Sequence, residues 1–470
     1  MKKERKIKKE RRLMEKTKIL SIREGCAYSV SEGLGMRYIT PFALKLGATN
    51  AHIGFLTSLP SLLGNFSQMF TPKLMEKTSR KKIVVLGALL QAIMWLFVIG
   101  IGALYFIFNI NSTITPTLLI IIYTLLTLFG AMLVPAWNSW MKDIVTENSG
   151  KYFGNRNRIV GFVALVSMLA GSFILDYFAK TKIFIGFVIL FTIAFIARLI
   201  STLILSKKYE PKISYEKGYY FSFWQFIRYI PKSNFGKFTV LVALMQLATA
   251  IASPFFAVYM LKELGFSYFQ WILVTLASSL TSLLFMPLWG KFVDRYGNIK
   301  ATKITSFLIP LVPLLWFVSI FINKNSLIPY LILIEAFSGM VWAGFNLASS
   351  NFIYDAVTRQ RMGLCVAYLN LLTGMGVFIG ATLGGFISST HLTLFGLSSI
   401  LIVFLISGIA RFAVALIMTP KVKEVRDVKK FGIKEAKEHL SVLTPAELWR
   451  HLEINIKLNG LKNYNHREKI

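Results

Sequence analysis

The sequence predicts an all-α integral membrane protein with 12 transmembrane helices in two pseudo-symmetric six-helix bundles. Three observations lead to this fold class. First, 55% of the 470 residues are hydrophobic and 14% are aromatic, which is too apolar for a soluble domain. Second, apolar runs of about 20 residues, the length that crosses a bilayer, recur along the chain. Third, landmarks of the first half return in the second half in the same order.

The apolar runs set the order of the elements. The expected helices cover residues 21–46, 50–71, 83–108, 115–141, 156–178, 183–206, 236–261, 267–289, 299–322, 327–354, 362–388 and 392–418. They divide the chain into a basic N-terminal tail (1–20), a first bundle (21–206), a linker (207–235), a second bundle (236–419) and a C-terminal tail (420–470). Each bundle would then hold six helices.

The net charge of +31 first suggests a nucleic-acid partner, but the position of the charges indicates a membrane. Of the 53 Lys and Arg residues, 44 fall in the two tails and in alternate loops, and four fall inside helices. The other loops contain only Lys45, Lys180, Lys182, Lys262 and Lys324. This asymmetry predicts a multi-pass protein of the plasma membrane with both termini in the cytoplasm. The N-terminal tail could also contact anionic lipid headgroups, and no nucleic-acid partner is required.

Two echoes support an internal repeat. The segment Trp140–Thr146 (WMKDIVT) is answered 212 residues later by Phe352–Thr358 (FIYDAVT). Arg198 and Arg411 each follow Ile-Ala, 213 residues apart, in the last helix of their half. Such spacing predicts two homologous bundles related by an axis along the membrane normal. Because the arginines repeat, we expect them to serve the architecture, by snorkelling toward the cytoplasm or by pairing with loop aspartates.

A third echo lies in two short charged loops. The segment WGKFVDRYGNIK joins the eighth and ninth helices, and its pattern G-x-x-x-D-R-x-G is carried by Gly290, Asp294, Arg295 and Gly297. About 218 residues earlier, Glu76-Lys77 stands where Asp294-Arg295 stands later. The pattern resembles the cytoplasmic signature loop of the major facilitator superfamily of transporters. The first-half copy departs from it, with Pro72 and Ser79 where glycines are usual.

The resemblance covers residues 20–420 and implies a secondary transporter that carries a small organic solute by alternating access. It implies that the first, fourth, seventh and tenth helices line a central cavity. Glu32 lies about 16 Å beyond the start of the first span, near the bilayer midplane, and Gly33 and Gly35 loosen the helix there. We expect Glu32 to bind substrate or couple transport to an ion. The alternative is a structural role, either a pair with Arg37 or hydrogen bonds to neighbouring helices.

The other cavity helices supply further polar residues. Glu335, Trp342 and Asn346 recur on one stripe of the tenth helix, and Glu335 is a candidate for proton coupling unless it is hydrated near the outer mouth. Trp342 is expected to pack rather than to stack on substrate. The fourth and seventh helices contribute candidates with predicted bends at Pro135 and Pro254, and these candidates are Tyr123, Asn138 and Gln246.

Asp143 and Asp355, at matching positions, are expected to hold arginines across the cytoplasmic face. Their predicted partners are Arg156 or Arg158 in the first half and Arg359 or Arg361 in the second half. Together with the signature residues Glu76, Gly290, Asp294, Arg295 and Gly297, such pairs would close an inward gate and break as the bundles rock. In the eleventh helix, glycines every fourth residue predict close helix packing, at Gly376, Gly380 and Gly384.

The polar segments also carry signals. Tyr219–Ile230 (YYFSFWQFIRYI) predicts an interfacial helix in the linker, the alternative being an aromatic-rich loop. In the tail, Thr444–Glu447 predicts a capping box that begins a short amphipathic helix. No cofactor, metal site or enzymatic centre is expected, because Cys26 and Cys365 lack CxxC spacing, all five histidines fall in or next to expected loops or tails, and no H-E-x-x-H or G-x-S-x-G motif appears. ATP-driven transport by this chain alone is not expected either, because it has no Walker A motif. We expect a monomeric carrier of a small molecule, coupled to protons. The alternative is a transport-inactive sensor or scaffold of the same fold.

Overall fold

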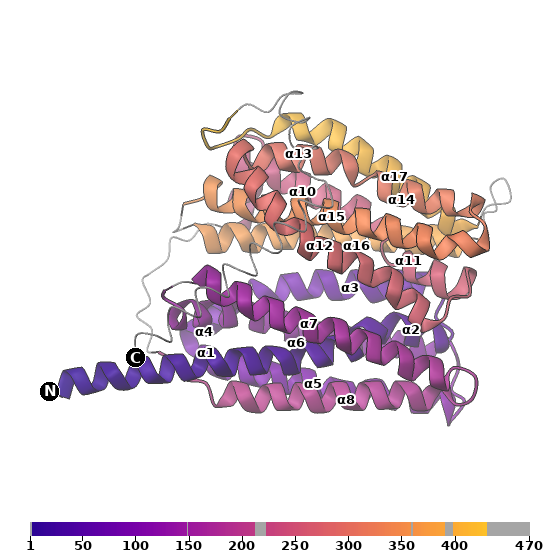
Figure 1. Cartoon of the computed structure of the whole chain (residues 1–470), viewed down its shortest axis with the longest axis horizontal. Helices are drawn as coiled ribbons and strands as arrows, with labels where there is room; N and C mark the ends of the chain where they lie inside the picture. Colours follow the sequence, from indigo (N-terminus) through magenta and orange to yellow (C-terminus); the bar gives the residue numbers. More distant parts are fainter. Residues whose placement is uncertain (1, 148, 212–221, 359–360, 391–397, 430–470) are drawn as a thin grey trace, which may run out of the picture.

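The computed structural model describes residues 2–147, 149–211, 222–358, 361–390 and 398–429. Every regular element in these ranges is helical, so the predicted all-α class is confirmed. The helices of the first half lie together in the lower part of Figure 1, and those of the second half lie above them. The predicted tail helix near Thr444 and the arginine at position 359 lie outside the described residues.

The long helices lie along one common axis (Figure 1). In chain order the elements are α1 Lys2–Leu34, η1 Met36–Tyr38, α2 Ile39–Lys45, α3 Asn50–Gln68, α4 Thr71–Lys77, α5 Arg80–Phe106, α6 Ile114–Ile144, α7 Ser149–Phe178, α8 Ile183–Ser206, α9 Phe223–Tyr229, α10 Asn234–Ala252, α11 Phe255–Val258, η2 Tyr259–Glu263, α12 Tyr268–Tyr296, α13 Asn298–Leu308, α14 Leu311–Val318, η3 Ser319–Phe321, α15 Lys324–Ala356, α16 Met362–Ser389, α17 Ser399–Met418 and η4 Thr419–Lys421. Within the described ranges, ten helical runs are long and apolar enough to cross a membrane. Together with α1–α2 and α3 they agree with the predicted twelve crossings.

Local signals fix where helices begin and break. Ser79, Ser233 and Ser267 each cap a helix by accepting a backbone N–H three residues on. The predicted bend at Pro254 is a break between α10 and α11, whereas α6 continues through Pro135. The crossing expected over 299–322 is present as one apolar run, Asn298–Phe321, which Pro310 divides into α13 and α14. A proline lacks the N–H that would continue the helix and its ring crowds the preceding turn.

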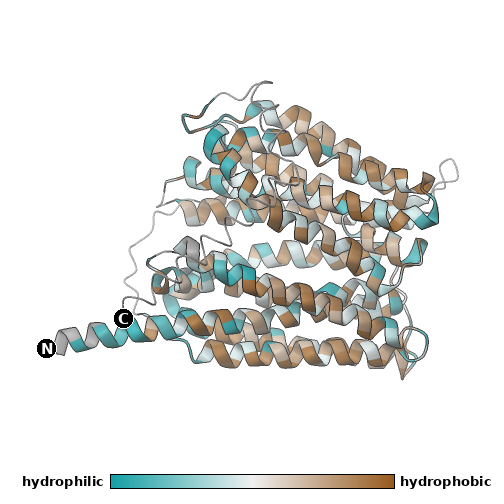
Figure 2. Ribbon diagram, viewed as in Figure 1, coloured by the Kyte–Doolittle hydropathy of each residue, from teal (hydrophilic) through white to brown (hydrophobic). Residues whose placement is uncertain are grey.

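Two charged segments are more helical than the sequence predicts. α1 begins at Lys2 rather than near residue 21, because its lysines, arginines and glutamates are good helix formers. α12 continues to Tyr296, so the expected loop before α13 shrinks to Gly297 alone. Of the linker segment predicted to form an interfacial helix, Phe223–Tyr229 is helical (α9), residues 219–221 lie outside the described residues, and the place at the membrane interface stays a prediction. Figure 2 shows hydrophilic residues gathered at the helix ends and hydrophobic ones between them.

The two halves contact each other along α3 and α16, from Asn50 and Ser388 to Gln68 and Asn370, and most widely at one end of the molecule. We call the end where α1 begins and α17 ends the tail end, and the opposite end the far end. At the far end one continuous apolar cluster contains buried residues of both halves, and the Tyr38 and Trp271 rings meet edge to face at 5.7 Å. At the tail end the described buried residues form separate clusters: one in the first half, around Trp140, and two in the linker and second half, around Phe238 and Val293. Met69 of the first half packs against the Phe238 cluster, beside the Gln68–Asn370 contact of α3 and α16.

Polar contacts also join the halves at the far end. Asn50 Nδ2 at the start of α3 donates to the Ser388 carbonyl of α16 at 2.8 Å. The Asp176 carboxylate of α7 accepts the backbone N–H groups of Tyr268 and Phe269 at 2.8 and 2.9 Å. A carboxylate at these first N–H groups of α12 is also favoured by the helix dipole. The far end is therefore closed by both apolar and polar contacts.

Candidate functional site

A cavity of about 290 Å³ lies within the first half, among α1, α5, α6, α7 and α8. Two of the predicted substrate residues, Glu32 and Asn138, line it, and a third, Tyr123, lines a smaller cavity of about 160 Å³ beside α2 and α3. The α1 residues that line the larger cavity recur at every fourth position, so they share one face of the helix. The polar and aromatic lining of the larger cavity comprises Glu24, Tyr28, Glu32, Gln91, Trp137, Asn138, Arg156 and Arg198.

Glu24 is the most heavily contacted carboxylate of this cavity. It is 5% exposed and accepts from Lys208 Nζ at 3.1 Å and from Ser201 Oγ at 3.2 Å, with Arg156 Nη2 at 3.8 Å. Burial lowers the pKa of Lys208, which follows the last turn of α8, and the Glu24 charge acts in the opposite direction. No role for Glu24 was predicted from the sequence. Its spacing of eight residues from Glu32 on α1 is the signal that could have found it.

Glu32 is half-buried and has no hydrogen-bond or ion-pair partner among the residues the structure describes. α1 ends two residues later, and the chain tightens into η1 where Gly35 lies against the Trp95 ring. The α-helix therefore continues through Gly33 and breaks at Gly35, where a tighter turn replaces the expected loosening. Arg37 lies in η1, exposed, so the alternative prediction of a Glu32–Arg37 pair is wrong: the helix break places the two residues on different segments.

The acidic candidate of the second half has a different environment. Glu335 lies half-buried on α15, and its Oε1 accepts from Trp316 Nε1 at 3.1 Å. Ser278 of α12 and Arg411 of α17 also lie within interaction range of its carboxylate. Three further candidates of this half line neither first-half cavity: Gln246 is half-buried on α10, Trp342 packs edge to face on a neighbouring ring, and Asn346 is exposed on α15.

Arg198 and Arg411 are buried, at 2% and 1% exposure. Arg198 lies over the Tyr28 ring, 4.8 Å from its centroid. Arg411 Nε donates to Ser407 Oγ at 3.0 Å, and its two Nη atoms donate to the backbone carbonyls of Ile309 and Thr249 at 3.5 and 3.3 Å. The prediction that these arginines snorkel or hold loop aspartates is wrong. Both lie inside their own half, where packed helices enclose them.

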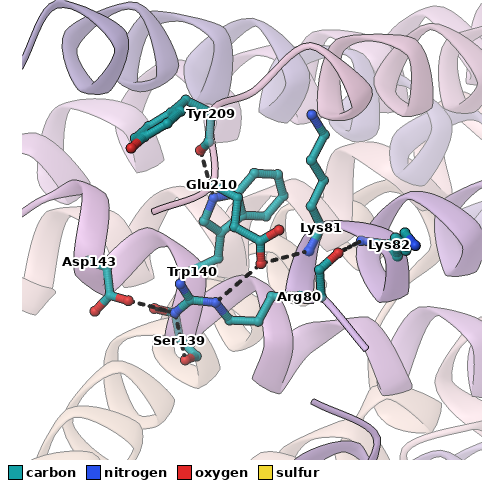
Figure 3. A network of polar contacts seen from close by, with 9 residues as sticks. Arg80, Lys81, Lys82, Ser139, Trp140, Asp143, Tyr209 and Glu210 are labelled. Carbon is teal, nitrogen blue, oxygen red and sulfur yellow. Dashed lines mark hydrogen bonds and ion pairs between the residues drawn. The ribbon is translucent and has the colours of Figure 1, made fainter. Parts of the chain in front are cut away.

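At the tail end of the first half, Arg80 holds two carboxylates (Figure 3). It begins α5 and is 1% exposed; its Nη1 donates to Asp143 Oδ2 at 2.7 Å and its Nε lies 3.6 Å from Glu210. The predicted pairing of Asp143 with Arg156 or Arg158 is therefore wrong for this structure. The start of α5 lies against the end of α6, whereas Arg156 points into the cavity, 4.7 Å from the Trp137 ring centroid, and Arg158 is exposed.

Asp355 occupies the matching place in the second half. Its Oδ2 accepts from Asn298 Nδ2 at 2.6 Å and lies 3.1 Å from Arg426 Nε, which belongs to the segment after α17. Arg361, a predicted partner, lies exposed at the start of α16. The other predicted gate residues of the two signature loops, Glu76, Asp294 and Arg295, are exposed at the tail end.

We call the contacts at the start of α5 and at the start of α13 the tail-end junctions of the first and second half. Besides Asp143 or Asp355, each junction contains a second carboxylate. Glu424 accepts the backbone N–H of Ile299 at 2.8 Å, as Glu210 accepts that of Lys81 at 3.3 Å. Glu424 also lies against Gly297, whose φ of +90° suits glycine and whose missing Cβ leaves room for the carboxylate. By contrast, Gly290 has open space around it, with Leu347 as its neighbour at 4.0 Å.

Comparisons with known proteins give a family and a fold. The profile of the Major Facilitator Superfamily matches residues 26–231 and 238–457. Vacuolar basic amino acid transporter 1 of Saccharomyces cerevisiae is 28% identical over 158 residues, 33% of this chain, and the match spans 27% of that relative's length. The nucleoside transporter NupG has a similar structure, with a TM-score of 0.64 at 15% identity over 87% of this chain and 98% of that chain. So has a bacterial homologue of the iron transporter ferroportin in an inward-facing state, at 0.62 and 13%, over 86% and 98%.

Proposed function

This chain belongs to the major facilitator superfamily and is a multi-pass membrane protein that moves a solute across a bilayer, and we propose that it does so by alternating access coupled to protons. The observation that carries the proposal is the unequal contact between the halves. They share one apolar cluster and polar bridges at the far end. Toward the tail end the contact among the described residues follows α3 and α16, and the buried residues of the other helices cluster within their own half. This is the arrangement of one end state of two rocking bundles.

The charge distribution supports an orientation. The tail end carries most of the lysines and arginines, which favours the cytoplasmic side of a plasma membrane. With this orientation, the proposal assigns the structure to an inward-facing state. When the halves rock, the bridges at Asn50 and Asp176 would break and the signature loops would approach across the tail end. The exposed Glu76, Asp294 and Arg295 would then gain the gate contacts predicted for them.

Glu335 is the proposed proton site. A carboxylate at membrane depth is stable only when it is paired, hydrated or protonated. The Glu335 carboxylate has an indole donor from Trp316 and lies near the guanidinium of Arg411, so protonation would change the charge balance inside the second half. A proton there would loosen its hold on α14 and α17, which are helices of the same bundle. Glu32, without a partner, faces the first-half cavity instead.

The test of alternating access uses two pairs of spin labels in a background with serine at Cys26 and Cys365. One pair, at Lys180 and Lys262, spans the far end; the other, at Lys77 and Lys291, spans the tail end, and all four positions are exposed. Pulsed electron paramagnetic resonance at acidic and alkaline pH should show the two distances changing in opposite directions. Distances that never change, at any pH or with any ligand, would support the transport-inactive sensor instead.

The coupling proposal has its own readout. In the Glu335→Gln variant the label distances should become independent of pH, because glutamine keeps the shape and cannot titrate. In proteoliposomes, uptake driven by a proton gradient should be lost while solute exchange without a gradient persists. If a protonophore leaves uptake by the unmodified protein unchanged, proton coupling is wrong.

A further inference from the structure

Arg198 has one free edge inside the first half. Its Nη1 donates to Ser201 Oγ at 3.0 Å, but its Nε and Nη2 are buried and have no partner among the described residues. These two atoms form the side of the guanidinium that can bind both oxygens of a carboxylate. Arg198 is 2% exposed and lines the 290 Å³ cavity. A buried cation with two unused donors is costly unless an acceptor reaches it.

The protein's own carboxylates do not fill this edge. Glu24 is held by Lys208, Ser201 and Arg156, and Glu32 makes no ion pair in the described part of the chain. The repeated fold does not require this edge of the guanidinium to be free either. Arg411, at the matching place of the second half, uses Nε and both Nη atoms in hydrogen bonds. The unused donors therefore distinguish Arg198 from its repeat partner Arg411. Within the described ranges, Arg80 also has Nε and Nη2 without a hydrogen bond, but it faces the carboxylates of Asp143 and Glu210.

The same cavity presents unused acceptors. Gln91 is 2% exposed; its Nε2 donates to the Leu126 carbonyl at 3.2 Å, which leaves Oε1 buried without a partner among the described residues. Glu32 adds a carboxylate that no cation of the described chain neutralises. A ligand that satisfies the whole lining must accept hydrogen bonds at Arg198 and donate them, with positive charge, at Gln91 and Glu32.

We propose that this cavity is the solute site and that it binds a small amine carboxylate, a zwitterion of the amino-acid type. The carboxylate binds the free edge of Arg198, and the ammonium group binds Glu32 and Gln91 Oε1. The volume is at the lower end of ligand cavities, roughly 300 Å³ and above, which suits a molecule of metabolite size. This assignment rests on the proposed transport function and names its substrate class.

The experiment measures thermal stabilisation and Kd of the purified full-length protein. The probes are the twenty standard amino acids, with three controls for leucine: 4-methylpentanoate, which lacks the amine, 3-methylbutylamine, which lacks the carboxylate, and phosphate as a plain anion. At least one amino acid should stabilise the protein, and its single-function analogues should not. If no amino acid binds, or if phosphate stabilises equally well, the assignment is wrong.

Variants separate recognition from folding. Arg198→Lys should raise Kd about tenfold to a hundredfold, because lysine cannot offer the bidentate edge. Arg23→Lys, at an exposed arginine of α1, should leave Kd unchanged. Glu32→Gln should reduce the preference for the amino acid over its carboxylate analogue, a change that a folding defect would not produce. An unaltered preference would contradict the role of Glu32. If label distances still alternate while no amino acid binds, this assignment fails and the proposed function stands.

Discussion

The two halves hold their tail-end carboxylates with different cations. In the first half Asp143 and Glu210 both face Arg80, which begins α5. In the second half the position of Arg80 is taken by Asn298, which begins α13 and binds Asp355 without a charge. The positive charge comes instead from the segment after α17, through Arg426. The carboxylates therefore occupy matching positions in the two halves, whereas the arginines that bind them come from different parts of the chain.

This difference indicates which junction is the easier to open. Arg80 is 1% exposed and is fixed by the first turn of a long helix, whereas Arg426 is 34% exposed and lies on a segment outside the bundle. Solvent screens an exposed pair, and a side chain on an open segment loses more freedom when it is held. We therefore expect the first junction to be rigid and the second to be the one that yields during gating. The next predictions test this order, from the largest effect to the smallest.

The largest effect should come from a rigid contact inside the second half. Gly380 of α16 lies against the Leu247 carbonyl of α10, and any side chain would overlap that backbone. We expect Gly380→Leu to reduce stability by about 3 kcal/mol or to prevent folding, because backbone cannot move aside as a side chain can. Thermal unfolding in detergent measures it. Gly161→Leu on α7, where the glycine has open space, is the control, and an equal loss in both would contradict the close packing.

The second prediction concerns the rigid junction. Arg80→Met should lower stability by about 2 kcal/mol, because it leaves Glu210 partly buried without its cation. The loss is smaller than for a fully buried pair, since Asp143 is 45% exposed and can be hydrated. The melting temperature of the purified variant measures the effect. A loss that disappears in the double variant Arg80→Met/Glu210→Gln would assign it to the uncompensated charge.

The third prediction tests the turn between α12 and α13. Gly297→Ala should cost about 1 to 2 kcal/mol, since alanine disfavours the positive φ and its methyl group would meet the Glu424 carboxylate. Gly290→Ala, two helical turns earlier with open space, should cost much less. Parallel melting curves of the two variants decide it, and a similar cost at both glycines would show that the turn is not strained.

The smallest effect on stability is expected at the second-half junction, where Arg426 binds Asp355. Arg426→Met should change stability by only about 0.5 kcal/mol, as for exposed ion pairs generally. It should nevertheless shift the label distances across the tail end, because one contact that holds α12 and α15 is gone. A stability loss as large as that of Arg80→Met would show that the two junctions are equally rigid.

Some features of the site could be predicted from the sequence and others could not. Glu32 and Asn138 were predicted as cavity residues because the family resemblance implies that the first and fourth helices line a cavity, and both line the same cavity within the first half. The exposed Arg37 and the partner of Asp143 were predicted wrongly, because each depends on where a neighbouring segment ends. Arg198 was interpreted as architectural because it repeats at Arg411. The two arginines differ only in their surroundings, because Arg411 uses Nε and both Nη atoms in hydrogen bonds and, within the described chain, Arg198 does not.

The sequence by itself determined the number and order of the helices, the repeat and the family. Hydropathy, charge and helix breakers act over a few residues, so these properties do not require knowledge of the packing. The tertiary structure alone decided which charges meet and which remain free. Arg80 reaches Asp143 across two helices, and Arg198 keeps an unused edge because Glu24 is already held by Lys208. Such choices depend on competition among residues far apart in the chain, which becomes visible only when the helices are packed.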